Sequence, residues 1–195
     1  MRQKEYSFTV SLPSWIEEVL PGPGRIYPGP EERMRFIVEL SRLNVEHGTG
    51  GPFAAGIFDL TSNTLLSAGV NLVIQTQCCL FHAEIVAILI AQQKVNTYDL
   101  GAAGFPPYEL VTSTEPCAMC LGALTWSGVR SLICGARDED ARAIGFDEGP
   151  KAPDWISALK ERGISVRQDI CRRDAVTVLR SYLQREGPCY NARQG

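Results

Sequence analysis

Strand-like and helix-like segments alternate along most of the chain, and this order constrains the fold more than any other feature of the sequence. The helix-like segments run from Glu31 to the stop signal Gly48 and then over 82–95, 117–126, 154–162 and 174–185. The apolar, strand-like segments are 53–60, 64–74, 108–113, 131–136 and 164–168. Because apolar strands joined by helices are covered on both faces, this order predicts an α/β fold with a mainly parallel sheet between two helical layers.

The two ends of the chain differ from this alternating region. Residues 20–30 hold three glycines and four prolines, a composition that excludes a helix or a central strand. We therefore expect an extended N-terminal arm over residues 1–30 and one folded domain over 31–187. Residues 188–195 are too few to form a unit of their own and are expected to be a short tail.

Charge and hydropathy exclude several classes of protein. The 195 residues carry a net charge of −3, so the chain as a whole has no attraction for nucleic-acid phosphates or anionic membranes. The N-terminus lacks the apolar stretch of a secretory signal, and the longest apolar run, 85–91, is too short to span a bilayer. We expect a cytoplasmic protein with no membrane or nucleic-acid partner, whose seven cysteines remain thiols.

Two cysteines three residues apart, Cys117 and Cys120, follow Pro116 at the expected start of a helix. On a helix they share one face near the positive end of the helix dipole, which favours thiolate over thiol. Such a pair suits a metal, although two buried core cysteines would show the same spacing. Taken alone, the pair leaves both readings open.

The triplet His82-Ala83-Glu84 offers an imidazole and a carboxylate at the expected start of another helix. His82 with the two thiolates would give a tetrahedral zinc three protein ligands and leave its fourth position to water, which is the arrangement of a catalytic zinc. The other histidine, His47, is interpreted as structural. A closed structural zinc would need a fourth ligand, for which the candidates are Cys78, Cys79 and Cys134.

The combination of H-A-E with P-C-x-x-C resembles the signature of zinc-dependent nucleobase deaminases of the cytidine/deoxycytidylate deaminase-like superfamily. The resemblance covers about residues 31–187. It implies a three-layer α/β/α sandwich around a central five-stranded mixed sheet, and a homodimer. It also implies one Zn²⁺ per chain, held by His82, Cys117 and Cys120, with a zinc-bound hydroxide that attacks the amino-bearing carbon while Glu84 shuttles protons.

The segment AIGFDEGP, residues 143–150, is similar to one in bacterial guanine deaminases. The similarity assigns Glu148 a second catalytic role, protonation of the departing amine, and implies conversion of guanine to xanthine and ammonia. A surface loop with two acids is the alternative for this segment.

Further substrate-binding candidates follow from the same resemblance and from side-chain chemistry. Asn71 can donate to and accept from a purine edge through its amide, and Ala83 lies between His82 and Glu84. Phe53 and Trp126 are candidates to sandwich a flat ring, although both could be core residues. The C-termini of related guanine deaminases cover an active site, which makes Tyr190 and Asn191 candidates here; a frayed end is the alternative.

Other activities remain compatible with the motifs. PCAMCLGA also resembles tRNA-adenosine deaminases, but such an enzyme needs a basic surface for its RNA. Deamination of cytidine, dCMP or an aminotriazine uses the same zinc chemistry. The non-enzymatic alternative is a zinc-stabilised binding domain, in which Glu84 would have no structural task.

Overall fold

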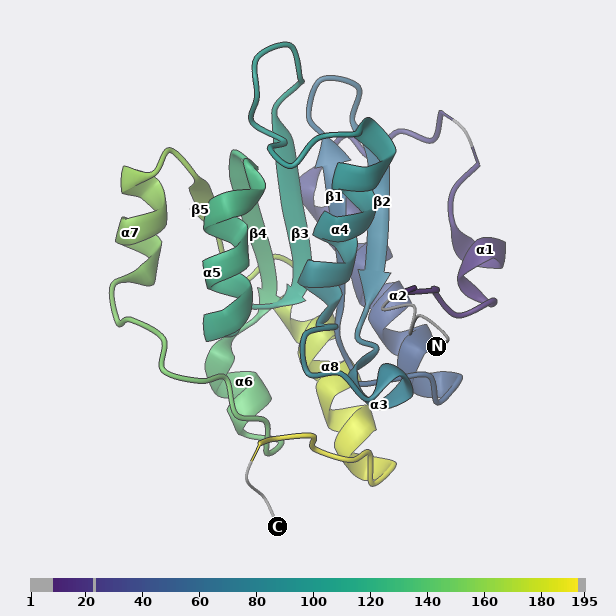
Figure 1. Ribbon diagram of the computed structural model, residues 1–195. Coiled ribbons are helices and arrows are strands. Elements are labelled where there is room, and N and C mark those ends of the chain that lie inside the picture. Colours follow the sequence, from purple (N-terminus) through teal and green to yellow (C-terminus); the bar gives the residue numbers. More distant parts are fainter. Residues whose placement is uncertain (1–8, 23, 193–195) are drawn as a thin grey trace, which may run out of the picture.

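A five-stranded sheet forms the middle layer of the computed structural model, which describes residues 9–22 and 24–192 (Figure 1). The strands lie side by side in the order β2-β1-β3-β4-β5. Their bounds are Ala54–Asp59 (β1), Thr64–Val70 (β2), Tyr108–Thr114 (β3), Ser131–Ala136 (β4) and Ser165–Arg167 (β5). Strands are thus found where the sequence predicts them, although Val73 and Ile74, expected at the end of the second strand, belong to a helix.

The sheet is mixed. β1 pairs antiparallel with both β2 and β3, whereas β3–β4 and β4–β5 are parallel pairs. The expectation of a mainly parallel sheet is therefore wrong, because the first two strands form a hairpin and the hairpin joins β3 through β1. The five-stranded mixed sheet implied by the family resemblance is confirmed.

Helices cover both faces of the sheet. α2 (Pro30–Glu46) and α8 (Arg172–Gln184) pack on one face, and α4 (Ala83–Val95), α5 (Ala118–Ser127) and α7 (Trp155–Glu161) pack on the other. Three short helices, α1 (Ile16–Val19), α3 (Val73–Thr76) and α6 (Asp138–Arg142), were not expected from the sequence. None of the helices in the described ranges combines the length and the hydropathy needed to cross a bilayer.

The two helical layers enclose two separate cores, and alternate residues of each strand supply them. In β3, Leu110 belongs to the core under α4 and α5, while Val111 belongs to the core under α2 and α8. Leu132 and Ile133 divide in the same way in β4. All four side chains are fully buried, and each contributes roughly 1.5–3 kcal/mol relative to exposure. Burial on both faces explains why consecutive positions in the middle of these strands are apolar instead of alternating with exposed polar residues.

The N-terminal arm is packed against the domain where it is described. Contrary to the expected extended conformation, α1 gives it one helical turn, because the prolines and glycines that exclude a helix begin only at Pro21. Trp15, Ile16 and Tyr27 are buried in the core under α2. Residues 1–8 and 23 of the arm lie outside the described ranges.

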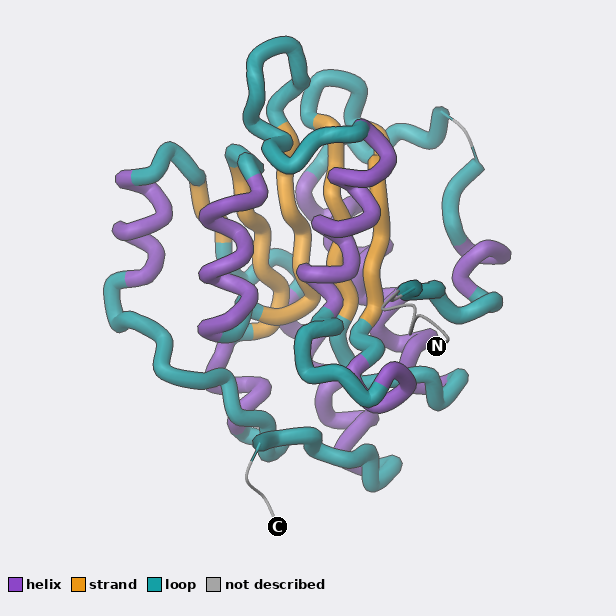
Figure 2. Tube along the Cα trace, viewed as in Figure 1, coloured by secondary structure: helices purple, strands orange, loops and turns teal. Residues whose placement is uncertain are grey.

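One end of the sheet gathers the segments that carry the motifs. The carboxyl ends of β3 and β4, the first turns of α4 and α5, and the C-terminal tail all lie at the lower end of the view in Figures 1 and 2. In open α/β sheets, ligands bind outside the carboxyl ends of the strands. The candidate site is therefore expected at this end.

Candidate active site and metal centre

Three metal-ligating side chains converge at this end of the sheet. The ligand atoms of His82, Cys117 and Cys120 lie within 4.8 Å of one another, and Cys117 Sγ is 3.4 Å from His82 Nδ1. One imidazole and two thiolates suit zinc, and three protein ligands leave a tetrahedral ion one open position. In the described part of the chain no fourth ligand joins this group.

The positions of the ligands follow from the two helix starts. His82 is the N-cap residue of α4 and Cys117 is the N-cap residue of α5, both with extended backbone, and Cys120 lies one turn into α5. Helix N-termini carry partial positive charge, which stabilises thiolates. The sequence therefore places both cysteines at the N-terminus of α5 and brings them to His82 through the packing of α4 beside α5.

Without a metal, contacts among the three ligand side chains shift the pKa of each of them. A hydrogen bond from Cys120, assisted by His82, lowers the pKa of the Cys117 thiol to about 4. The same hydrogen bond, together with burial, raises the pKa of Cys120. Burial lowers the pKa of His82, but the hydrogen bond and charge of Cys117 outweigh it, and the net pKa is raised. Cys117 is thus a thiolate near neutral pH even before metal binds.

Glu84 lies beside the ligands on the first turn of α4. Its side chain is buried, and its Oε2 accepts a hydrogen bond from Cys120 Sγ at 3.4 Å. Burial and the charge of Cys117 raise the pKa of the Glu84 carboxyl. A carboxyl with a raised pKa, next to a metal site, can take up and return a proton near neutral pH.

A cavity of about 410 Å³ adjoins the metal centre, a size typical of small-molecule sites. Its wall includes His82, Glu84 and Cys117, and also Asn71 and Glu148 from segments distant in the sequence. The structure thus brings eight predicted site residues to one cavity, since Phe53, Tyr190 and Asn191 also line it. Burial raises the pKa of Glu148 to about 8, so this second carboxyl retains its proton near neutrality.

Glu148 is carried by residues 145–151, which we call the acid loop. Its backbone carbonyl accepts a hydrogen bond from Ala118 N–H, at 2.9 Å, on the first turn of α5. Gly145 gives the loop its sharp entry, with a φ of +100° that other residues rarely adopt. The surface-loop alternative is wrong for Glu148, which is buried, and holds for Asp147, which is exposed.

Asn71 directly follows β2, and its Oδ1 accepts a hydrogen bond from Val73 N–H at 3.3 Å. Sequence reasoning missed the residue that holds it. Asn44, fully buried on α2, donates from Nδ2 to the carbonyls of Asn71 (3.0 Å) and Gly51 (2.8 Å). No local pattern distinguishes Asn44 from an exposed helical asparagine, because the Asn71 backbone that it holds is 27 residues away in the sequence.

Of the two aromatic residues predicted to sandwich a flat ring, one lines the cavity and the other does not. Phe53 lines the cavity, where it meets Phe146 edge-on with ring centroids 4.9 Å apart. Trp126 does not line it: the side chain is 82% exposed on the outer face of α5, which corrects the prediction. Phe146, in the same segment as Glu148, is the cavity aromatic that the sequence reasoning missed. Ala83 is fully buried behind the cavity wall, and its role in binding stays a prediction.

Within the described part of the C-terminal tail, residues 190–192 lie against the cavity rather than frayed in solvent. Tyr190 packs edge-on against Phe146, with centroids 5.1 Å apart, and its ring centroid lies 6.4 Å from that of His82. Asn191 lines the cavity too, but its amide bonds to the acid loop: Nδ2 donates to Gly145 O (2.7 Å) and Oδ1 accepts from Asp147 N–H (2.8 Å).

Comparison with known proteins identifies similar chains. A family model described as the cytidine and deoxycytidylate deaminase zinc-binding region matches residues 30–136, which include all three candidate ligands. The solved guanine deaminase from Nitrosomonas europaea is 46% identical with a TM-score of 0.87, over 91% of this chain and 97% of that one. A second solved structure, of a protein in complex with 2,6-diaminopurine, is 47% identical to this chain with a TM-score of 0.88, and the match covers 95% of this chain and 97% of that one. Guanine deaminase from Bacillus subtilis (strain 168) is 34% identical over 118 residues, 60% of this chain and 71% of the relative.

Proposed function

Because the chain belongs to the cytidine and deoxycytidylate deaminase zinc-binding family, we propose that it hydrolyses guanine to xanthine and ammonia. Membership confirms the resemblance inferred from H-A-E and P-C-x-x-C, together with the cytidine-deaminase-like fold and the requirement for Zn²⁺. Similarity to a guanine deaminase over 91% of the chain supports guanine over other bases. The reaction consumes one water and replaces the amino group at C2 by oxygen.

The metal centre and Glu84 prepare the water. Zinc held by His82, Cys117 and Cys120 supplies a Lewis acid that lowers the pKa of water from about 15.7 to about 7. Glu84, two residues after His82 and 3.4 Å from Cys120 Sγ, accepts the proton of the attacking water and delivers it to a ring nitrogen. The buried position of the carboxyl supports this shuttle, because burial raises its pKa and makes it a stronger base.

Glu148 and Asn71 serve the other atoms of the base. An amine leaves a tetrahedral carbon readily only after it is protonated, and the buried Glu148 carboxyl, with its pKa raised to about 8, can provide that proton. The Asn71 amide can donate to and accept from the purine edge. Phe53 and Phe146 offer apolar surface to the ring and limit access of bulk water.

The observation that carries the proposal is the shared cavity: two carboxyls with raised pKa, the metal ligands His82 and Cys117, and an amide line a single space. A zinc-stabilised binding domain would need neither carboxyl there. The net charge of −3 also weighs against an RNA substrate.

A substrate panel tests the proposal. Purified zinc-loaded protein is incubated separately with guanine, adenosine, cytosine, cytidine, dCMP, an aminotriazine and a tRNA, and ammonia is measured. We expect kcat/KM for guanine to exceed that for each other compound by at least about 10²-fold, the size of effect expected when polar groups match only one substrate. Preference for any other compound would reject guanine as the substrate, and no release from any of them would favour the binding domain.

We further propose that the chain forms a homodimer through the outer face of α4 and α5. Trp126 on α5 is 82% exposed and Leu89 on the adjacent α4 is 39% exposed, so the two helices present apolar surface to solvent. A second copy would bury it. In sedimentation, Trp126→Glu should then shift the protein toward monomer, while the control Tyr98→Glu, at a loop aromatic that is 88% exposed, should not. A monomeric wild type would reject the proposal.

We also propose that the chain consists of an N-terminal arm, a catalytic domain and a C-terminal tail, in which the arm stabilises the active site and the tail covers it. A hydrogen-bond chain supports the arm's role: Trp15 Nε1 donates to Thr49 Oγ1 (3.1 Å), and Thr49 donates to Asn44 Oδ1 (2.6 Å), which in turn holds Asn71. Removal of the arm should therefore raise KM for guanine, and an unchanged KM would contradict it.

For the location we propose the cytoplasm. None of the seven cysteines is paired in a disulfide, which suits a reducing compartment. Fractionation of the source cells tests this, and recovery outside the cytoplasmic fraction would reject it.

A further inference from the structure

Lys151 ends the acid loop with a side chain that is only 9% exposed, an unusual position for a lysine. Its Nζ donates to the carbonyl of Pro116 at 3.0 Å and forms an ion pair with Asp138 Oδ1 at 2.7 Å. Glu115 Oε2 lies 3.6 Å away. The ammonium is therefore fixed by three groups, two of which belong to the residues immediately before Cys117.

These contacts join the acid loop to the turn that carries a metal ligand. Pro116 directly precedes Cys117, so the hydrogen bond from Lys151 to Pro116 attaches the acid loop on the N-terminal side of this ligand. On the other side, Ala118 N–H donates to Glu148 O at 2.9 Å. The loop is thus attached at two points flanking Cys117, and the Glu148 carboxyl is positioned relative to the metal centre by both.

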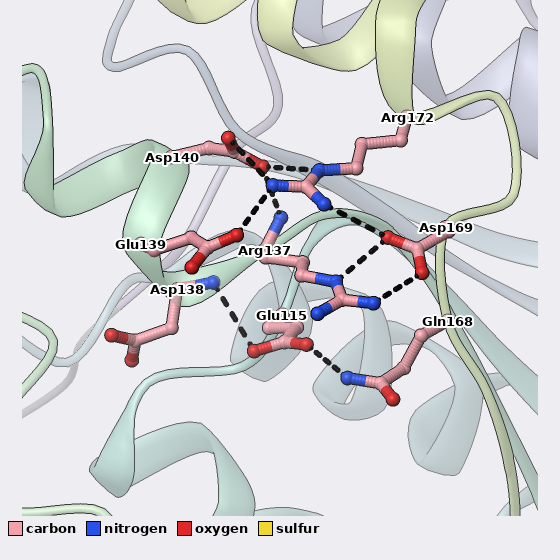
Figure 3. Close-up of polar contacts among 8 residues, drawn as sticks. All are labelled: Glu115, Arg137, Asp138, Glu139, Asp140, Gln168, Asp169 and Arg172. Atoms are coloured by element: carbon pink, nitrogen blue, oxygen red, sulfur yellow. Dashed lines mark hydrogen bonds and ion pairs between the residues drawn. The ribbon is translucent and has the colours of Figure 1, made fainter.

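The acids that hold Lys151 are themselves part of a rigid frame. Figure 3 shows Glu115 accepting hydrogen bonds from the backbone N–H of Asp138, at 3.1 Å, and from the side chain of Gln168. The surrounding ion pairs tie α6 to the start of α8, namely Arg137–Asp169, Arg172–Asp140 and Arg172–Glu139. Because this frame fixes Glu115 and Asp138, the position of Lys151 is fixed as well.

We propose that Lys151 is a positioning residue for the reaction, which holds the Glu148 carboxyl in the place where it serves the departing amine. This inference rests on the proposed function of Glu148. It assigns Lys151 an effect mainly on the chemical step rather than on binding, since Asn71 and Phe53 line the cavity from segments outside the acid loop. A displacement of about 1 Å at a reacting group can cost about 10²-fold in rate.

Single variants test the effect on kcat. Lys151→Met keeps the length of the side chain and removes the charge; we expect kcat for guanine to fall about 10- to 100-fold, KM to change less than about threefold, and zinc to remain at one per chain. Lys151→Arg, which keeps the charge and the donors, should recover most of the loss. Lys160→Met, at an exposed lysine of α7, is the matched control and should behave as wild type. A loss confined to KM, or no loss, would overturn the proposal. If Lys151→Met does not fold, Lys151→Gln makes the same comparison.

A double-mutant cycle separates positioning from general destabilisation. If Lys151 acts through Glu148, Lys151→Met should slow a Glu148→Gln enzyme hardly at all, whereas a merely structural role would give losses that multiply. Multiplicative losses would therefore contradict the proposal.

Hydrogen exchange gives a readout that does not depend on the substrate. Lys151→Met should speed exchange of the amides in residues 145–151 and of Ala118, while Lys160→Met should not. If the wild type fails to deaminate guanine, the proposed function is wrong, yet faster exchange would still place Lys151 as the clamp of the loop. Unchanged exchange would reject the clamp whatever the substrate.

Discussion

Replacement of Glu84 by glutamine should separate catalysis from folding. Glutamine has the shape of glutamate but cannot cycle a proton, and general acid–base catalysis contributes about 10²–10⁴-fold. We therefore expect kcat for guanine to fall by that factor, which corresponds to roughly 2.7–5.4 kcal/mol of transition-state stabilisation. Glu84 is not a metal ligand in this geometry, so zinc should stay at one per chain.

Stability should not fall with activity. The pKa of Glu84 is raised because burial disfavours its charged form, so at neutral pH the ionised carboxylate is less favourable in the fold than in the unfolded chain. A neutral amide removes that cost, and the thermal midpoint of zinc-free Glu84→Gln should equal or exceed that of the zinc-free wild type. Ammonia release, zinc analysis and calorimetry measure the three quantities, with Glu161→Gln, at an exposed glutamate of α7, as the control. Turnover within about threefold of wild type would refute the proton shuttle.

Three further predictions address other parts of the site and the fold. In chelator-treated protein at pH 6, iodoacetamide should modify Cys117 through its thiolate and zinc should protect it, because its pKa is lowered to about 4; equal labelling with and without zinc would refute the ligand role. Gly51→Ala would bring a Cβ within 2.4 Å of Tyr190 Oη, so it should release the tail, speed tail proteolysis and raise KM; unchanged proteolysis would contradict the packing. Arg33→Met removes the ion-pair partner, at 2.6 Å, of the buried Glu109 carboxylate, and should lower the free energy of unfolding by about 3–5 kcal/mol, or Tm by roughly 6–20 °C. Adding Glu109→Gln should recover part of that loss. Calorimetry measures the stability of both variants, and a loss below about 1 kcal/mol for Arg33→Met would refute the prediction.

Local patterns in the sequence predict the metal centre well because each half of it is a helix start. His82 and the pair Cys117 and Cys120 are short motifs whose geometry depends on one turn of helix, and the structure brings them together as expected. The order of strands was harder, since alternation of helices and strands does not say which edge of the sheet a hairpin joins. The hairpin of β1 and β2 joins β3 through β1, so two of the four strand pairs are antiparallel, which the alternation did not predict.

Contacts between distant segments account for what the sequence did not reveal. Trp126 and Leu124 are both apolar residues of α5, yet one is 82% exposed and the other fully buried, because this helix is apolar around its whole circumference. Asn44 and Lys151 gain their roles from contacts with distant segments: the Asn71 carbonyl is 27 residues from Asn44, and the Pro116 carbonyl is 35 residues from Lys151. Their composition and neighbours in the chain carry no sign of those partners.

X-ray absorption at the zinc edge of the purified protein tests the central claim most directly. We expect one zinc per chain with one imidazole nitrogen at about 2.0–2.1 Å, two sulfurs at about 2.3 Å and one oxygen that no protein side chain supplies. The His82→Ala variant should lose the nitrogen shell. A spectrum with three or four sulfurs, or with a full set of protein ligands, would describe a closed structural site and would contradict the proposed deaminase.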